Sequence, residues 1–173
     1  DELVIATPEN GIAHAEFLQK NGMKPQMAIF HHGAVERTEK YLISTGVLKQ
    51  PYYWIIMEGD SGTAVLDPIS MCESLLLYLS MIRKIDQKYG GKSVVIVGGC
   101  GRSGMYVATL AMMLGLHVRI GMEDMVFKWP HKDIKVESNG DEVGRAVSIA
   151  HALDREVATP NEYRQIIGLP TRN

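Results

Sequence analysis

The chain has 173 residues, 46% of them hydrophobic and 22% charged, and its 18 basic and 20 acidic residues give a formal net charge of −2. This composition is typical of a globular protein and excludes a disordered, collagen-like or coiled-coil chain. The balanced charge and the pI near 6.3 argue against a nucleic-acid-binding protein, which would carry a clustered basic face. No apolar run approaches the ~18 residues of a membrane helix, so we expect no membrane contact.

The cysteine content and the first residues bear on where the protein works. Two cysteines, Cys72 and Cys100, are too few for a disulfide framework, which predicts a reducing, cytoplasmic location. The sequence begins with Asp1, and no charged-then-apolar leader follows it. We therefore expect no signal peptide and interpret the chain as truncated.

Short apolar runs alternate with longer segments of helical character. Five runs are predicted to be strands: Leu3–Thr7, Gln26–Phe30, Tyr53–Met57, Ser93–Val97 and His117–Met122. Helices are predicted from the Asp67 cap to about Tyr89, from the Ser103 cap to Leu114, over residues 143–153, and after a capping box at Thr159–Glu162. Apolar strands that alternate with helices predict a parallel sheet covered by helices.

Two architectures fit this alternation, a doubly wound open sheet and a (β/α)₈ barrel. No linker or internal repeat divides the chain, so residues 1–173 are predicted to form a single domain. A complete barrel needs ~250 residues, and 173 residues supply only about five to six βα units at that rate. Either the sheet is open or the N-terminal part of a barrel is missing.

Polar or glycine-rich groups follow four of the predicted strands, at the end where both fold types place their active sites. They are His31–Gly33, Glu58–Gly62, Gly98–Gly104 and Glu123–Asp124. Since side chains alternate along a strand, Arg119 and Glu123 are expected on one polar face of the last strand, with Asp124 beside them. They could bind a metal or polarise a carbonyl. The alternative is an interior ion pair that only neutralises itself.

The segment Gly98–Gly104 is similar to a phosphate-binding loop. Gly101 and Ser103 lie where backbone amides at a helix start can approach an anion, and Arg102 adds positive charge. The glycine spacing matches neither the Walker nor the dinucleotide fingerprint, so a tight βα turn is the alternative. Neighbouring His31 and His32 point in different directions on a strand, so at most one is expected to face the cavity. Cys100 lacks an evident base and is interpreted as a loop thiol.

The stretch Gly115–Asp124 resembles the signature of the β-keto acid cleavage enzymes, especially in its Arg-x-Gly-x-Glu-Asp element. The resemblance extends over Gly22–Phe30, Gly46–Leu48 and Arg145–Pro160, and so over nearly the whole chain. Two positions depart from the family pattern. Gln26 stands where the family usually has Glu, and His31 follows Phe30 where an acidic residue is common.

The resemblance implies a (β/α)₈ TIM barrel, of which this chain would supply about strands 5–8 and the preceding helix. It implies that Glu123 is a zinc ligand, Asp124 the catalytic base and Arg119 its electrostatic partner. The remaining zinc ligands, a His-x-His pair, are expected upstream of residue 1. A homo-oligomer is also implied.

The implied reaction converts a β-keto acid and acetyl-CoA into acetoacetate and a new acyl-CoA. Zinc would polarise the keto group, and a carboxylate such as Asp124 would remove the adjacent proton. The loop with Gly101, Arg102 and Ser103 is the candidate for binding the CoA phosphates. Two other interpretations stay open: a metal-dependent lyase of the aldolase type, which would turn over without CoA, and a non-catalytic half-barrel interaction module, which would bind no zinc.

Overall fold

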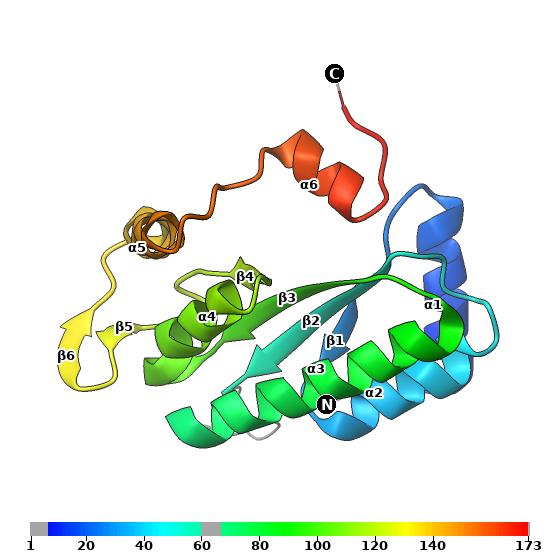
Figure 1. Ribbon diagram of the computed structural model, residues 1–173, viewed down its shortest axis with the longest axis horizontal. Helices are drawn as coiled ribbons and strands as arrows, with labels where there is room; N and C mark the ends of the chain where they lie inside the picture. The colour runs from blue at the N-terminus through cyan, green and yellow to red at the C-terminus, as the bar shows by residue number, and fades with distance from the viewer. Residues whose placement is uncertain (1–6, 60–66, 173) are drawn as a thin grey trace, which may run out of the picture.

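A four-stranded parallel sheet forms the centre of the protein in a computed structural model that describes residues 7–59 and 67–172 (Figure 1). Its strands are β1 (Met27–Ile29), β2 (Tyr52–Glu58), β3 (Ser93–Gly99) and β4 (His117–Arg119). They lie side by side in chain order, and each pairs in parallel with the next. The predicted parallel α/β fold is therefore confirmed. The order never reverses among these strands, whereas a doubly wound sheet has a reversal.

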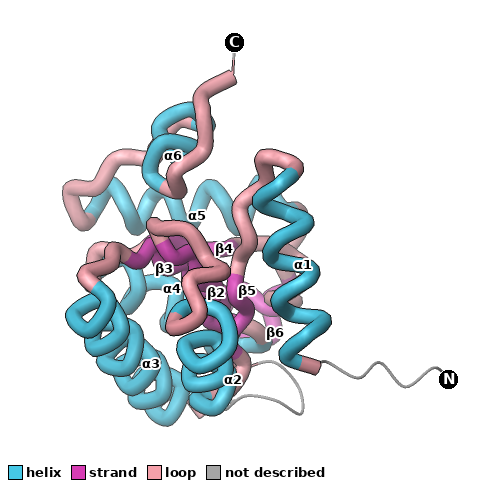
Figure 2. Tube along the Cα trace, turned by 90° about the vertical axis from the view of Figure 1, so that its right-hand side faces the viewer, coloured by secondary structure: helices cyan, strands magenta, loops and turns pink. Residues whose placement is uncertain are grey.

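The described helices are α1 (Pro8–Lys20), α2 (His32–Thr38), α3 (Pro68–Tyr89), α4 (Gly104–Met113), α5 (Asn139–Ala152) and α6 (Pro160–Ile166). A π-helical turn, η1 (Glu39–Ile43), extends α2, and a 3₁₀ turn, η2 (Gly101–Ser103), leads into α4. Figure 2 shows α2 and α3 below the sheet, α6 above it and α1 along its right-hand side. No helix among residues 7–59 and 67–172 combines the length and apolarity needed to cross a membrane.

The two faces of the sheet differ in what they contact. Trp54 and Ile56 on β2 are fully buried and belong to the apolar core that also contains side chains of α2 and α3. Ile55 and Met57, which alternate with them, line a cavity on the other face. The helix-covered face thus supplies the core, and the other face is available for a site.

Three predicted strands are confirmed, and the fifth is shorter than predicted. β4 ends at Arg119, because the backbone amides of Asp124 and Met125 both donate to the carbonyl of Gly121, each at 3.2 Å. This turn prevents the strand from continuing to Met122. The expectation that Glu123 shares a strand face with Arg119 is therefore wrong, although the two side chains do meet. The predicted strand at Leu3–Thr7 lies outside the described residues except for Thr7, which caps α1.

Two of the predicted helix starts are confirmed in detail. The Asp67 carboxylate accepts the amide of Ser70 at 2.9 Å, and Thr159 forms the predicted capping box with Glu162. The Ser103 cap is wrong, because Ser103 lies in the η2 turn with φ −91° and ψ 0° and its side chain makes no capping bond. An extended backbone at that position is what a capping side chain requires.

The antiparallel hairpin of β5 (Phe127–Trp129) and β6 (Lys132–Lys135) was not predicted. Its second strand is exposed throughout and rich in lysine, so it lacks the apolar alternation that marks a strand. The hairpin lies between β4 and α5 in sequence.

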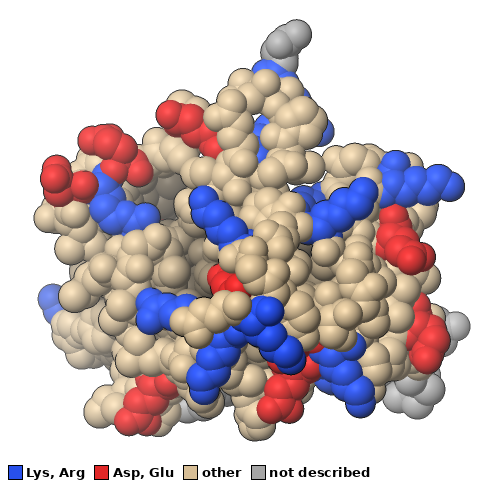
Figure 3. Space-filling view, turned by 45° about the vertical axis from the view of Figure 1, so that its right-hand side comes forward, with Lys and Arg blue, Asp and Glu red and all other residues tan. Residues whose placement is uncertain are grey.

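Basic and acidic side chains are interspersed over the face shown in Figure 3.

Candidate active site

A cavity of about 700 Å³ lies on the sheet face opposite α2 and α3, at the carboxyl ends of the strands. Its lining combines apolar side chains with a small charged group: Gln26, Ala28, Phe30, Ile55, Met57, Gly59, Cys100, Gly101, Arg119, Glu123 and Asp124. A second cavity, of about 470 Å³, lies between α1, β1 and α2 and contains none of the predicted site residues. The larger cavity is therefore the candidate active site.

Asp124 and Arg119 form a two-bond ion pair in the cavity wall. The Arg119 Nε atom donates to Asp124 Oδ2 at 2.8 Å, and its Nη2 atom donates to Oδ1 at 3.1 Å. The Asp124 side chain is only 6% exposed, so the pair is shielded from water on the carboxylate side. Such fork-shaped contacts fix the orientation of a carboxylate as well as its charge.

Glu123 differs from Asp124 in exposure. Its side chain is 83% exposed and accepts a bond from Arg119 Nη2 at 2.5 Å. Burial lowers the pKa of Arg119, but the hydrogen bonds and charges of Asp124, followed by the charge of Glu123, outweigh burial and raise this pKa overall. The guanidinium thus stays charged between two carboxylates, one buried and one open to solvent.

One backbone hydrogen bond and one side-chain contact hold Asp124 against the loop after β3. The amide of Gly101 donates to the Asp124 carbonyl at 2.8 Å, and Cys100 Sγ lies 3.9 Å from Asp124 Oδ1. Gly101 has φ +69°, a backbone conformation that favours glycine. The loop after β3 and the turn after β4 therefore meet at Asp124.

The structure places the three loop residues predicted to bind CoA in different surroundings. Gly101 lines the cavity, but Ser103 is 5% exposed and does not line it. Arg102 contacts the hairpin: its Nη2 atom lies 2.6 Å from Asp133 Oδ1, and its guanidinium lies 3.7 Å from the centre of the Phe127 ring. A Cβ atom on Gly99 would stand 2.6 Å from the Cα of Gly104, so close packing of strand and helix requires glycine there.

Glu58 was predicted among the polar groups at the strand ends, but its carboxyl is buried on the helix side of the sheet and does not line the cavity. It is fully buried at the end of β2, and Ser74 Oγ on α3 lies 2.8 Å from both of its carboxylate oxygens. Burial raises the pKa of Glu58 to about 7, although the bond from Ser74 opposes this shift. The alternation of Trp54, Ile56 and Glu58 on one strand face was the signal that it faces the helices.

The described residues do not by themselves make a zinc site. No group of three or more potential ligand side chains occurs in the described part of the chain, and zinc takes three or four protein ligands. Glu123 is a single carboxylate already paired with Arg119. His31 and His32 are both exposed at the start of α2, and neither lines the larger cavity.

Comparison with known proteins establishes the family. The model of the beta-keto acid cleavage enzyme family matches residues 1–169. The chain belongs to the beta-keto acid cleavage enzyme family. It is 32% identical to a 3-keto-5-aminohexanoate cleavage enzyme of Fusobacterium nucleatum and 28% identical to another of Acetoanaerobium sticklandii, over 98% of this chain in each case.

More distant relatives extend the comparison. A 3,5-dioxohexanoate:acetyl-CoA acetone transferase of Paraburkholderia graminis is 25% identical over 75% of this chain. The chain spans 56% and 57% of the length of the two cleavage enzymes, and 39% of the transferase. The chain therefore spans little more than half the length of the two cleavage enzymes and less than half that of the transferase.

The fold is also similar to a solved structure. The apo structure of ObcA superposes with a TM-score of 0.70 and 16% identity, over 94% of this chain and 40% of that chain. At this identity the likeness concerns the fold alone, and it places the parallel α/β fold close to a TIM-barrel-type fold.

Proposed function

We propose that the protein is a zinc-dependent enzyme that condenses a β-keto acid with acetyl-CoA to give acetoacetate and a new acyl-CoA. We also propose that β1–β4 are about strands 5–8 of its (β/α)₈ barrel. The family supplies the class of reaction. The observation that supports the reaction most directly is the Asp124 carboxylate, oriented by Arg119 in the wall of a large, partly apolar cavity. Such a carboxylate suits the removal of a proton from carbon beside a ketone.

In the proposed reaction, Asp124 accepts a proton from the carbon between the keto and carboxylate groups. The enolate formed attacks the thioester carbonyl of acetyl-CoA and expels the CoA thiolate. The thiolate adds to the original keto carbonyl, and the carbon–carbon bond breaks to give the new acyl-CoA and the enolate of acetoacetate. Asp124 returns its proton to that enolate. Arg119, charged and adjacent, stabilises negative charge near Asp124.

Replacing Asp124 by Asn in the full-length protein tests this role. We expect kcat for acetoacetate formation from a β-keto acid and acetyl-CoA to fall by roughly 10²–10⁴, the usual contribution of a general base. The matched control is Asp133→Asn, because Asp133 is also paired with an arginine but lies on the hairpin. Equal activity of the two variants would contradict the proposal, and turnover without CoA would favour the aldolase-type lyase.

A further inference from the structure

The Asn139 side chain bonds the backbone of the turn that carries Glu123 and Asp124. The Asn139 Oδ1 atom accepts the backbone amide of Met122 at 2.8 Å, across 17 positions of sequence. Met122 directly precedes Glu123. This bond reaches the backbone beside the two carboxylates, so its effect on them passes through the backbone.

A second observation shows how closely Asn139 approaches the turn. A Cβ atom built on Gly121 would stand 3.3 Å from Asn139 Oδ1, which is closer than most Cβ contacts. The Gly121 carbonyl in turn accepts the amides of Asp124 and Met125. The absence of a side chain at Gly121 thus lets Asn139 reach the turn at the point where the turn closes.

The Asn139 side chain is available for this contact because its neighbour caps the helix. Ser138 Oγ accepts a hydrogen bond from the amide of Asp141 at 3.1 Å and so caps the N-terminus of α5. Asn139, the first residue of α5, can therefore direct its oxygen to the Met122 amide instead.

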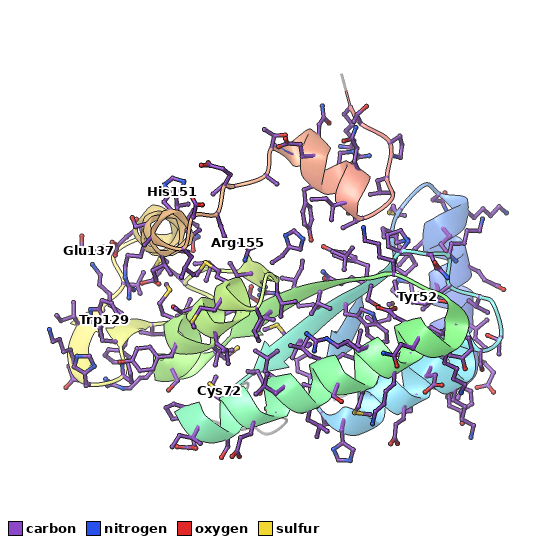
Figure 4. All side chains as sticks on the ribbon, viewed as in Figure 1. Tyr52, Cys72, Trp129, Glu137, His151 and Arg155 are labelled. Carbon is purple, nitrogen blue, oxygen red and sulfur yellow. The ribbon has the colours of Figure 1, made fainter. Side chains whose placement is uncertain are left out.

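The start of α5 is itself anchored to the hairpin. The guanidinium of Arg145 donates to the carbonyl of Lys128 at 2.7 Å and lies 4.3 Å from the centre of a Trp129 ring, and Lys128 Nζ lies 2.8 Å from Asp141 Oδ2. Figure 4 shows Trp129 on the hairpin and Glu137 between the hairpin and α5. Asn139 therefore lies at the end of a helix that contacts with the hairpin hold in place.

We propose that Asn139 is a positioning residue, which fixes the Gly121–Met125 turn so that Asp124 keeps its two bonds to Arg119. The kinetic part of this inference rests on the proposed function, because it assumes that Asp124 acts in catalysis. The geometric part does not. Cys100 Sγ, 3.9 Å from Asp124 Oδ1, provides a chemical probe of where that carboxylate lies.

The probe is alkylation of Cys100 by iodoacetamide in full-length protein that retains no other cysteine. A carboxylate beside a thiol disfavours the reactive thiolate. Asp124→Asn calibrates the rate without that charge. We expect Asn139→Ala to move the rate at least half of the way toward this reference, and Asn139→Asp, which keeps the acceptor, to stay near the unchanged protein. Ser138→Ala is the matched control, because it weakens α5 without touching the turn.

The kinetic readout is the split between kcat and KM. We expect Asn139→Ala to lower kcat roughly tenfold to a hundredfold with KM for the β-keto acid nearly unchanged, since a small misplacement of a catalytic group acts mainly on the chemical step. An alkylation rate in Asn139→Ala equal to that in Ser138→Ala would overturn the positioning role. If Asn139→Ala shifts the alkylation rate but the unchanged full-length protein has no β-keto acid cleavage activity, the positioning role is supported and the proposed function is overturned.

Discussion

Asp124 and Glu123 are neighbours in sequence but have opposite environments. Asp124 is nearly buried and bonded twice by Arg119, whereas Glu123 is 83% exposed and bonded once. A buried, oriented carboxylate suits proton transfer, and an exposed one is free to exchange its partner. Composition cannot distinguish the two residues, and only the turn after β4 does so.

Glu58 shows how the surroundings of a single residue alter its chemistry. Its carboxyl lies in the layer between β2 and α3, where the Ser74 hydroxyl is its hydrogen-bond partner. Burial favours the neutral acid and raises the pKa from 4.5 to about 7. Between these values the folded protein keeps a proton that the unfolded chain has lost.

The free energy of unfolding should consequently fall as pH rises from 4.5 to 7, by an amount of roughly 3 kcal/mol attributable to Glu58. We expect Glu58→Gln to be more stable than the unchanged protein at pH 8, and the gain to disappear toward pH 4.5. Urea unfolding at several pH values measures this. Glu39→Gln is the control of opposite sign, because a hydrogen bond from Lys88 lowers the pKa of Glu39. A pH-independent difference for Glu58→Gln would contradict the argument.

At the scale of elements, the hairpin and the loop after β3 are linked by Arg102. Its ion pair with Asp133 and its contact with the Phe127 ring attach the hairpin to the start of α4. The same arginine was predicted to bind CoA phosphates. The two roles make different demands, because an anion at this loop would compete with Asp133 for the guanidinium.

Two variants separate these roles by the KM for acetyl-CoA. If Arg102 contacts phosphate, Arg102→Ala should raise this KM about tenfold, the value of one charge-assisted contact, and Asp133→Ala should leave it unchanged or lower it. If Arg102 only anchors the hairpin, both variants should have similar effects. An unchanged KM in Arg102→Ala would remove this loop from the CoA site.

The elements themselves were predictable where their signals are local. The Asp67 cap, the capping box at Thr159 and the apolar strand from Ser93 depend on residues within a few positions of one another. The exposed hairpin and the early end of β4 depend on contacts with other segments. A local sequence pattern carries no information about contacts with distant segments.

Over the molecule as a whole, the chain is shorter than the curated relatives that it matches. The chain spans 56% of the length of a curated relative with which it shares 32% identity. Its described residues offer zinc one carboxylate from Glu123 and no set of three ligands. Zinc binding is thus a prediction about the full-length protein, with the other ligands on another segment.

We expect full-length protein to contain about one zinc ion per chain, and Glu123→Gln to lose most of it, because removal of one of three protein ligands weakens a zinc site strongly. Elemental analysis after gel filtration measures the content. Glu137→Gln, another exposed glutamate, is the control. Full zinc content in Glu123→Gln would show that this carboxylate is no ligand.

The parallel α/β fold, the family and the place of Arg119, Glu123 and Asp124 at a strand end could be predicted from the residues alone. These follow from apolar periodicity, glycine and proline punctuation, and a motif within one short stretch. Four features required the folded chain: Asp124 is buried while Glu123 is exposed, Arg102 contacts a hairpin, Glu58 faces α3, and Asn139 bonds the Met122 amide. Each depends on two segments distant in sequence meeting in space, and the packing of the whole fold sets which side chain becomes desolvated there.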